Sequence, residues 1–286
     1  MHDIDLRSLE IFRAVAHEGS VTRAAAKLNR VQSNISTRIR QLEDRLQKAL
    51  FLRRNRRLTL TPDGRLLLQY AERLLQLTAE AEEALNGAAP TGPFRIGAME
   101  STAAARLPAI LSRYHADHPD VALEVETDVA AGLLAKLQDH EIDAAFIAEP
   151  VEAAGVESQP VFEEALVLLT PASYPPLEDP SGISGKTIVA FEQGCAYRAY
   201  LERWVRDAGV APASVISVGS YLAILACVSA GTGYAVAPKS VLDAIASDGD
   251  FRRTPLPPPY DRIRTLLCWR AGDGSAKLEA LKRAMP

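Results

Sequence analysis

The spacing of apolar residues changes once along this chain, at a Gly- and Pro-containing stretch over residues 87–93 (GAAPTGP). Before it, apolar side chains recur every three or four residues, which predicts helices. After it, short apolar strands alternate with helices, which is typical of an α/β domain, and we expect its sheet to be mostly parallel. The 286 residues are therefore expected to form two domains joined by a hinge.

Three helices are predicted in the first 46 residues, and a tight turn joins the last two. They span residues 5–17, 21–28 and 32–46. Gly19 ends the first helix, Ser20 suits the N-cap of the second, and Asn29 suits a left-handed residue that ends the second. Short helices joined in this way, the later one polar on its outer face, are typical of a helix-turn-helix motif.

The third helix turns polar side chains outward, because Ile35, Ile39 and Leu42 follow the inward spacing. The N-terminal part of a recognition helix enters the major groove, where hydroxyls and amides hydrogen-bond base edges. We therefore expect base contacts from Gln32, Ser33, Ser36 and Thr37. Contacts to the DNA backbone are expected from Arg30, Arg38 and Arg40.

A basic hairpin is predicted after the third helix, with a strand around Leu58 and Leu60. Its tip is expected to act as a wing on phosphates or in the minor groove, through Arg53, Arg54, Arg56 and Arg57.

Charge is divided unevenly along the chain. The net charge is −4, but residues 1–61 carry +7 and the remainder carries −11. A basic head on an acidic body favours binding of a polyanion by the head alone. The alternative is a solvated basic face on a small helical bundle, which explains any single arginine but explains the whole combination poorly.

A long helix is predicted over residues 62–86, with Thr61 as its N-cap and Pro62 in its first turn. Apolar residues follow at alternating three- and four-residue steps, as in a coiled coil: Leu67, Tyr70, Leu74, Leu77, Ala81 and Ala84. Two interpretations stay open, a seam that joins two subunits and a helix that packs on its own domain.

Residues 6–69 resemble the LysR-type transcriptional regulators. The matching residues are Leu9, Phe12, Val15, Gly19, Ser20, Ala24, Ala25, Leu28, Gln32, Ser33, Ser36, Ile39, Leu42, Glu43, Leu50, Phe51, Arg53, Leu60, Thr61 and Gly64. The sequence departs from the family twice: Gln47-Lys48 replaces a glycine common after the third helix, and Ser33 replaces a proline.

The resemblance implies a winged helix-turn-helix, a linker helix that forms a dimer, and a two-lobed α/β effector domain like periplasmic solute-binding proteins. We expect the DNA-binding domain over residues 1–61, the linker and hinge over 62–91, and the effector domain over 92–286. Within the effector domain, lobe I is expected over about 92–163 and 266–286, and lobe II over about 164–265.

The resemblance also implies a ligand between the two lobes, at strand-to-helix turns. The candidate residues are Glu100, Ser101, Thr102, Gln193, Gly194, Cys195, Tyr197, Arg198 and Ser220. Arg198 suits a carboxylate, whereas Glu100 would repel an anion and attract an amine, so a zwitterionic or carboxylate-bearing effector is expected. Two alternatives stay open: Glu100 and Ser101 only cap a helix, and Cys195 is either a plain small side chain or a redox sensor.

Catalytic motifs are absent from the sequence, and its five histidines show no metal-ligand spacing, so we expect no enzyme activity, cofactor or metal. Three widely spaced cysteines and an N-terminus without a signal peptide favour a cytoplasmic protein that no membrane helix anchors. The expected function is sequence-specific transcription regulation by a homodimer or homotetramer that contacts promoter DNA and RNA polymerase. The rivals are an enzyme or solute-binding domain with a helical appendage, and a purely architectural DNA binder.

Overall fold

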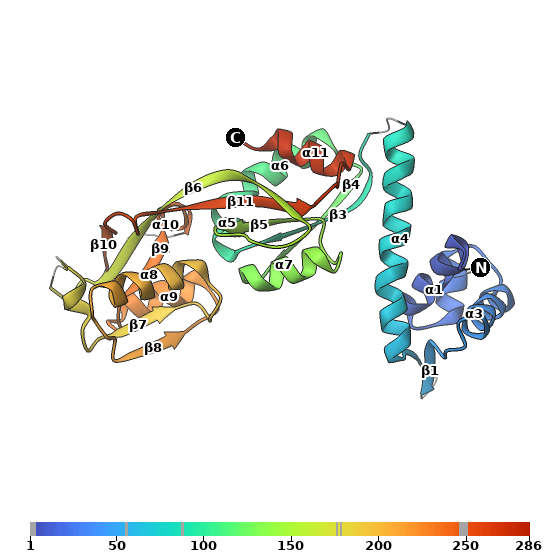
Figure 1. Cartoon of the computed structure of the whole chain (residues 1–286), viewed down its shortest axis with the longest axis horizontal. Coiled ribbons are helices and arrows are strands. Elements are labelled where there is room, and N and C mark those ends of the chain that lie inside the picture. The colour runs from blue at the N-terminus through green and yellow to red at the C-terminus, as the bar shows by residue number, and fades with distance from the viewer. Residues whose placement is uncertain (1–3, 55–56, 87–88, 176, 178, 246–250) are drawn as a thin grey trace. The chain divides into compact units, whose positions relative to one another are not determined.

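The computed structural model describes residues 4–54, 57–86, 89–175, 177, 179–245 and 251–286. The chain divides into two compact units, Met1–Ala88 and Ala89–Pro286, and each is described by itself (Figure 1). None of the helices in these described ranges has both the length and the apolar character needed to cross a bilayer.

The N-terminal unit contains four helices and one hairpin within its described residues. They are α1 (Leu6–Glu18), α2 (Val21–Lys27), α3 (Gln32–Leu46), β1 (Phe51–Arg54), β2 (Arg57–Leu60) and α4 (Pro62–Asn86). Ser20 caps α2 with its hydroxyl, and both Gly19 and Asn29 have the predicted left-handed conformation, with φ of 58° and 50°. The predicted helix boundaries are therefore confirmed to within about a residue at this end of the chain.

A single apolar core holds the three short helices, the hairpin and the start of α4 together. Phe12, Val15, Ala24 and Ile35 lie at its centre, with no exposed surface. The hairpin is tied to this core because the amide of Leu58 donates to the carbonyl oxygen of Gly19 at 3.3 Å.

Helix α4 has one apolar face that packs on its own unit and another that is exposed. The two interpretations of its apolar pattern, packing on its own domain and contact with a second subunit, therefore apply to different residues. Ala71 and Leu75 are buried in the core of their own unit. Tyr70, Leu74 and Leu77 lie on the other side and are each about half exposed, at 51%, 45% and 63%. Apart from Arg73, whose guanidinium lies over the Tyr70 ring at 5.5 Å, no contact of these exposed side chains is seen within the described part of the chain, which is the situation expected of a subunit contact.

The C-terminal unit begins with strands and helices in alternation: β3 (Gly92–Ala98), α5 (Glu100–Ala105), α6 (Leu107–Asp117), β4 (Val121–Thr127), α7 (Ala130–Gln138), β5 (Ala144–Ala148) and β6 (Val156–Pro171). A short 3-10 helix η1 (Pro180–Ile183) then leads to β7 (Thr187–Ala190), α8 (Ala196–Asp207), β8 (Ser214–Ser217), α9 (Tyr221–Ser229) and β9 (Ala235–Pro238). The last elements are α10 (Lys239–Ile245), β10 (Phe251–Pro255), β11 (Arg262–Arg270) and α11 (Ala276–Ala284).

Two long strands, β6 and β11, run through both lobes of this unit (Figure 1). The first lobe holds β3, β4 and β5 with α6, α7 and α11, and the second holds β7 to β10 with α8, α9 and α10. The main sheet has the order β10-β6-β11-β5-β3-β4, with β9 also paired to β6. The ladder between β6 and β11 contains one irregularity at Thr265/Leu266, where the register skips Val161.

The expectation of a mostly parallel sheet is wrong. Only β3–β4, β3–β5 and β7–β8 are parallel among the described strand pairs, whereas β11–β5, β11–β6, β6–β9 and β10–β6 are antiparallel. The cause is that β6 and β11 return along the sheet against their neighbours, a pairing that alternation of strands and helices does not reveal.

Candidate DNA interface and effector pocket

The exposed face of α3 carries the polar side chains that the sequence predicts for DNA contact. Ile35, Ile39 and Leu42 are buried and fix the rotation of the helix. Around them, Gln32, Ser33, Thr37 and Arg40 are exposed, Ser36 and Arg38 are partly buried, and Arg30 is exposed in the turn before the helix. The hydrogen-bonding groups of these residues therefore stand on a rigid support, as base reading requires.

An open hollow on α3 collects some of these residues together with others that the sequence analysis missed. It is lined by Ser33, Asn34, Thr37, Arg38, Gln41 and Arg45. Gln41 and Arg45 extend the row of Ser33 and Thr37 by one and two further turns, so the helical period was the signal that pointed to them. Gln32, Ser36 and Arg40 lie outside the hollow, on the adjoining part of the helix.

The start of α3 offers backbone donors. Its N-cap is Val31, which makes no side-chain hydrogen bond to the first turn and is 68% exposed. Because the first amides of a helix have no partner within the helix, they can donate hydrogen bonds to a phosphate oxygen.

The base of the hairpin is fixed by Glu43, whose carboxylate accepts from the amides of Leu50 at 2.8 Å and Phe51 at 3.2 Å. The backbone of β1 and β2 pairs Arg54 with Arg57 at the end of the hairpin. Arg56 and the side chains of Arg53, Arg54 and Arg57 lie outside the described residues, so the predicted wing contacts stay predictions.

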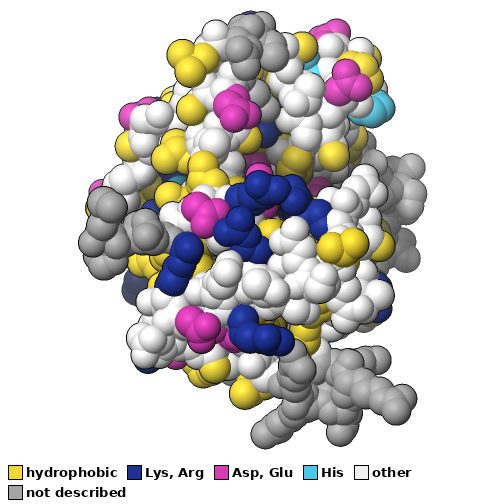
Figure 2. Space-filling view, turned by 90° about the vertical axis from the view of Figure 1, so that its right-hand side faces the viewer, with side chains coloured by type: hydrophobic (Ala, Val, Ile, Leu, Met, Phe, Trp, Pro, Cys, Tyr) yellow, Lys and Arg dark blue, Asp and Glu magenta, His cyan; other side chains and the backbone are white. Residues whose placement is uncertain are grey.

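Figure 2 is a space-filling view, turned by 90° about the vertical axis from the view of Figure 1. Lys and Arg side chains gather around the middle of this face, among uncharged polar atoms. The exposed basic residues of α2 and α3 and of the turn between them are Arg23, Lys27, Arg30, Arg40 and Arg45. This surface has the charge and the hydrogen-bonding groups that bind a phosphate backbone.

The C-terminal unit contains a pocket of about 190 Å³ where its two lobes meet. Its walls come from the turns that follow β3, β4, β7 and β8: Met99, Glu100, Ser101, Thr127, Asp128, Val129, Ala130, Phe191, Glu192, Gly194, Cys195, Ala196, Tyr197, Gly219 and Tyr221. Each of these strands runs parallel to a neighbour, and the carboxyl ends of parallel strands are where α/β folds bind ligands.

Contacts across the pocket join the two lobes. A carboxylate oxygen of Glu100, Oε1, accepts from the backbone amide of Tyr221 at 3.5 Å. The hydroxyls of Ser101 and Tyr197 are hydrogen-bonded at 3.1 Å. The rings of Phe191 and Tyr221 meet edge to face with centroids 4.8 Å apart, and they form an aromatic wall.

Glu100 is the half-buried acid of the pocket. Its second oxygen, Oε2, is fully buried and has no hydrogen-bond partner among the described residues. Burial raises the pKa of this carboxyl above its ordinary value, and the amide of Tyr221 only partly offsets that effect. Lys and Arg side chains are absent from the described lining.

Five of the nine predicted effector residues line the pocket: Glu100, Ser101, Gly194, Cys195 and Tyr197. Thr102 is buried behind the lining, Gln193 points to solvent, and the hydroxyl of Ser220 caps α9. The guanidinium of Arg198 is turned elsewhere, because it donates to Glu202 at 2.7 Å and to the carbonyl oxygen of Phe191 at 2.9 Å. The geometry therefore gives no support to carboxylate recognition by Arg198.

The two alternatives left open by the sequence are narrowed by the local geometry. Met99, rather than Glu100 or Ser101, is the N-cap of α5, and no side chain caps that helix. Burial raises the pKa of the Cys195 thiol. A thiol that stays protonated at neutral pH is a poor nucleophile, which favours the plain interpretation of Cys195.

The sequence analysis missed the part of the lining contributed by residues 127–130. The signal was available, because the sequence predicts a strand over residues 121–125 and a helix over residues 131–138, with a strand-to-helix turn between them. Applying the rule for strand-to-helix turns to every strand, and not to selected ones, finds these residues.

Two family models match the chain. The model described as the LysR substrate binding domain matches residues 87–285, and the model of bacterial regulatory helix-turn-helix proteins of the lysR family matches residues 6–65. The HTH-type transcriptional regulator YusT of Bacillus subtilis is 40% identical over 258 residues, which cover 90% of this chain and 86% of YusT. These matches span both units, so they do not fit a solute-binding domain with an unrelated appendage.

Solved structures of the same fold include a full-length OxyR variant of Pseudomonas aeruginosa, with a TM-score of 0.77 and 24% identity over 99% of this chain and 95% of that one. CbnR, solved in complex with its target DNA, gives a TM-score of 0.66 and 20% identity over 99% of each chain. At this identity the likeness concerns the fold alone. The family models and YusT decide the assignment: the chain belongs to the LysR family of helix-turn-helix transcriptional regulators, which pair a DNA-binding domain with an effector-binding domain.

Proposed function

We propose that this regulator reads its promoter with the exposed face of α3, laid in the major groove with its N-terminal end deepest. Gln32, Ser33, Ser36 and Thr37 contact bases, and Arg30, Arg38 and Arg40 contact phosphates, with Asn34 and Gln41 added to the base-reading row. The carrying observation is the row of exposed polar side chains on a helix whose other face is buried. CbnR, which shares the fold, has been solved with its target DNA, and this supports the same use here.

The wing completes this interface in the proposal, through Arg53, Arg54, Arg56 and Arg57 on the adjacent phosphates or minor groove. We assign DNA binding to residues 1–61, subunit contact to the linker over 62–91, and effector binding to 92–286, with lobes over about 92–163 plus 266–286 and 164–265. The exposed stripe of Tyr70, Leu74 and Leu77 on α4 supports the subunit contact. The proposed assembly is a cytoplasmic homodimer or homotetramer that contacts RNA polymerase at the promoter.

The pocket between the lobes is the proposed effector site. A ligand there touches both lobes. It shifts the equilibrium between two arrangements of the lobes to the extent that it binds one arrangement more tightly than the other. Of the expected effector classes, the ammonium group of a zwitterion suits Glu100, whereas a carboxylate finds no cationic side chain in the described lining.

A gel-shift titration of the full chain with the DNA upstream of its own gene tests the reading of DNA. We expect specific binding whose log affinity falls linearly with log salt, because basic side chains displace counterions from phosphates. Scrambled DNA of the same length serves as the control. Equal affinity for both DNAs, or no shift at low salt, would overturn the proposal.

A further inference from the structure

The carboxylate of Glu100 lacks the partners that a buried charge needs. Oε2 has none among the described residues, and Oε1 has only the long 3.5 Å contact with the amide of Tyr221. A carboxylate that is withdrawn from water without a partner is unfavourable, so it takes up either a proton or a cation. The side chain of Glu100 lines the pocket, so a ligand bound there can supply that cation.

The basic side chains nearest in the fold are already committed to other acids. Lys136 binds Asp128 at 3.2 Å and Glu126 at 3.1 Å, so it neutralises the acid of the opposite wall. Arg106, at the end of α5, binds the buried Glu164 at 2.7 Å. Arg198 binds Glu202. The described lining thus keeps an excess of negative charge, which Glu192 at the rim increases.

The remaining walls suit an organic cation. Phe191 and Tyr221 present aromatic surface, and Tyr197 adds a third ring that is 3% exposed. Aromatic faces attract cations as well as apolar groups. Met99 and Val129 contribute aliphatic surface. A cavity of about 190 Å³ is smaller than the roughly 300–1,000 Å³ of sites for drug-sized ligands, so the ligand is small.

We propose that the pocket selects a small organic cation without a carboxylate, such as an alkyl- or arylalkylammonium ion, whose N–H group donates to an oxygen of the Glu100 carboxylate. This inference rests on the proposed effector site and narrows its ligand to one charge class. The cation binds at the junction of the lobes, because Glu100 follows β3 of the first lobe while its other oxygen faces the start of α9 in the second. A zwitterion is disfavoured because its carboxylate would meet the acidic lining.

Titration calorimetry of the full chain with four probes of similar size tests the charge preference. The probes are benzylamine as cation, phenylglycine as zwitterion, benzyl alcohol as neutral analogue and benzoate as anion. We expect benzylamine to bind at least about tenfold more tightly than each of the others, the value of one hydrogen bond between charged groups. Equal or tighter binding of any other probe overturns the proposal, and so does the absence of binding by all four.

Two variants assign the effect to its residue. Glu100→Gln keeps the shape of the side chain and is expected to lower benzylamine affinity about tenfold or more. Glu152→Gln removes an equal charge from an exposed residue outside the pocket lining and is expected to change the affinity less than about threefold. Unchanged affinity in Glu100→Gln overturns the assignment, and the probe order of the unaltered chain remains a test even where a variant fails to fold.

Failure of the proposed function is separate from failure of this inference. Gel shifts on the same preparations report DNA reading without any probe, whereas calorimetry reports the pocket without DNA. If the gel shift is lost while benzylamine still binds more tightly than the other three probes, only the DNA-reading proposal is overturned. If the affinities of the four probes do not depend on their charge, only the proposed ligand class is overturned.

Discussion

Gly64 lies directly against the carbonyl oxygen of Leu50, so close that a Cβ at residue 64 would fall 2.2 Å from that oxygen. The contact packs the first turn of α4 against the residues that lead into β1. The hydroxyl of Thr61 donates to the carbonyl oxygens of Ala49 and Leu50 at the same place. A glycine is required here by space, not by an unusual backbone angle.

Gly64→Ala is therefore expected to destabilise the N-terminal unit by about 1–3 kcal/mol, because the backbone of Leu50 must move to admit the methyl group. Thermal or urea unfolding followed by circular dichroism measures the change. Gly274→Ala is the matched control, since a Cβ at residue 274 meets no atom within 4 Å. Equal losses in the two variants would show that the close approach does not matter.

Side chains on α3 are expected to separate into two classes by their effect on DNA binding. Thr37→Ala is expected to alter sequence preference and to cost about 1–3 kcal/mol on the cognate site, because it removes a contact to a base edge. Arg40→Ala is expected to weaken all sequences about equally and to lower the salt slope by about 1. Quantitative gel shifts on cognate and scrambled DNA distinguish the two.

Arg283→Ala is the charge-matched control for these variants. It removes the same positive charge from the exposed surface of α11, in the other unit. We expect no change in preference or salt slope. A loss equal to that of Arg40→Ala would mean that total charge, and not position on α3, governs binding.

Binding of benzylamine is expected to weaken as the pH falls toward and below the raised pKa of Glu100. Desolvation favours the neutral carboxyl, and a protonated carboxyl offers no charge to the cation, while the amine itself stays protonated from about pH 5 to 8. The other titratable groups around the pocket are Asp128 with its partner Lys136, Glu192, Cys195, Tyr197 and Tyr221. Calorimetry over this pH range measures the profile.

The pH profile has its own control in Glu100→Gln, which is expected to bind weakly and without this pH dependence. Burial raises the pKa values of Cys195, Tyr197 and Tyr221 too, so these three stay uncharged over the same range. A pH dependence that survives in Glu100→Gln would show that Glu100 is not its source.

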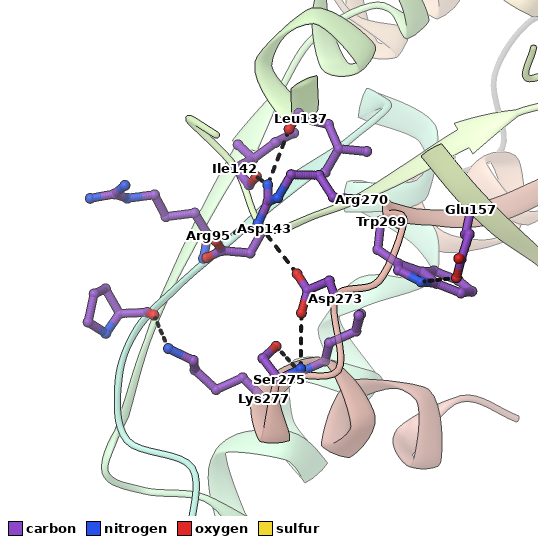
Figure 3. A network of polar contacts seen from close by, with 12 residues as sticks. Arg95, Leu137, Ile142, Asp143, Glu157, Trp269, Arg270, Asp273, Ser275 and Lys277 are labelled. Atoms are coloured by element: carbon purple, nitrogen blue, oxygen red, sulfur yellow. Dashed lines mark hydrogen bonds and ion pairs between the residues drawn. The ribbon is translucent and has the colours of Figure 1, made fainter. Parts of the chain in front are cut away.

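Arg270 fastens the end of β11 to the first lobe (Figure 3). Its guanidinium donates to the carbonyl oxygens of Ile142 at 2.6 Å and Leu137 at 3.2 Å, and it pairs with Asp143 and Asp273. Arg270→Met is expected to lower the free energy of unfolding of the C-terminal unit by about 3–5 kcal/mol, because it leaves buried carboxylates and carbonyls without their donor. Urea unfolding measures the loss.

Arg264→Met is the control from the same strand. Arg264 pairs with Glu149 at 2.6 Å but is 56% exposed, and ion pairs in that setting contribute little to the free energy of unfolding. Similar losses for the two variants would contradict the importance of burial.

Local signals were sufficient for the N-terminal unit. The pattern of Ile35, Ile39 and Leu42, together with Thr61-Pro62 at a helix start, predicts α3 and α4 with the observed bounds. The position after α3 is more informative. The backbone of Gln47 there adopts φ of 52°, the left-handed conformation that glycine usually takes at the end of a helix. The residue that replaces the family's glycine therefore still ends α3 in a left-handed turn.

Pairings distant in the sequence were not predictable in the same way. The edge strand β10 contains Pro255 and two arginines, and it becomes a strand only because β6 lies beside it. Helix α8, by contrast, carries Tyr197, Leu201, Trp204 and Val205 at helical spacing, so it was missed although the signal was present. The position of Arg198 had a local signal that was not used, because Glu202 lies four residues further along the same helix and accepts from its guanidinium.

The long strands β6 and β11 carry a mechanical consequence. Since both lobes are built onto the same hydrogen-bonded ribbon, they cannot drift apart as independent bodies, and the motion left to them is a twist about that ribbon. The ladder between β6 and β11 is interrupted at Val161, which the register skips. We expect the two strands to twist most easily at that point. A displacement of one lobe relative to the other is therefore expected to be a rotation about this ribbon, and not a separation of the lobes.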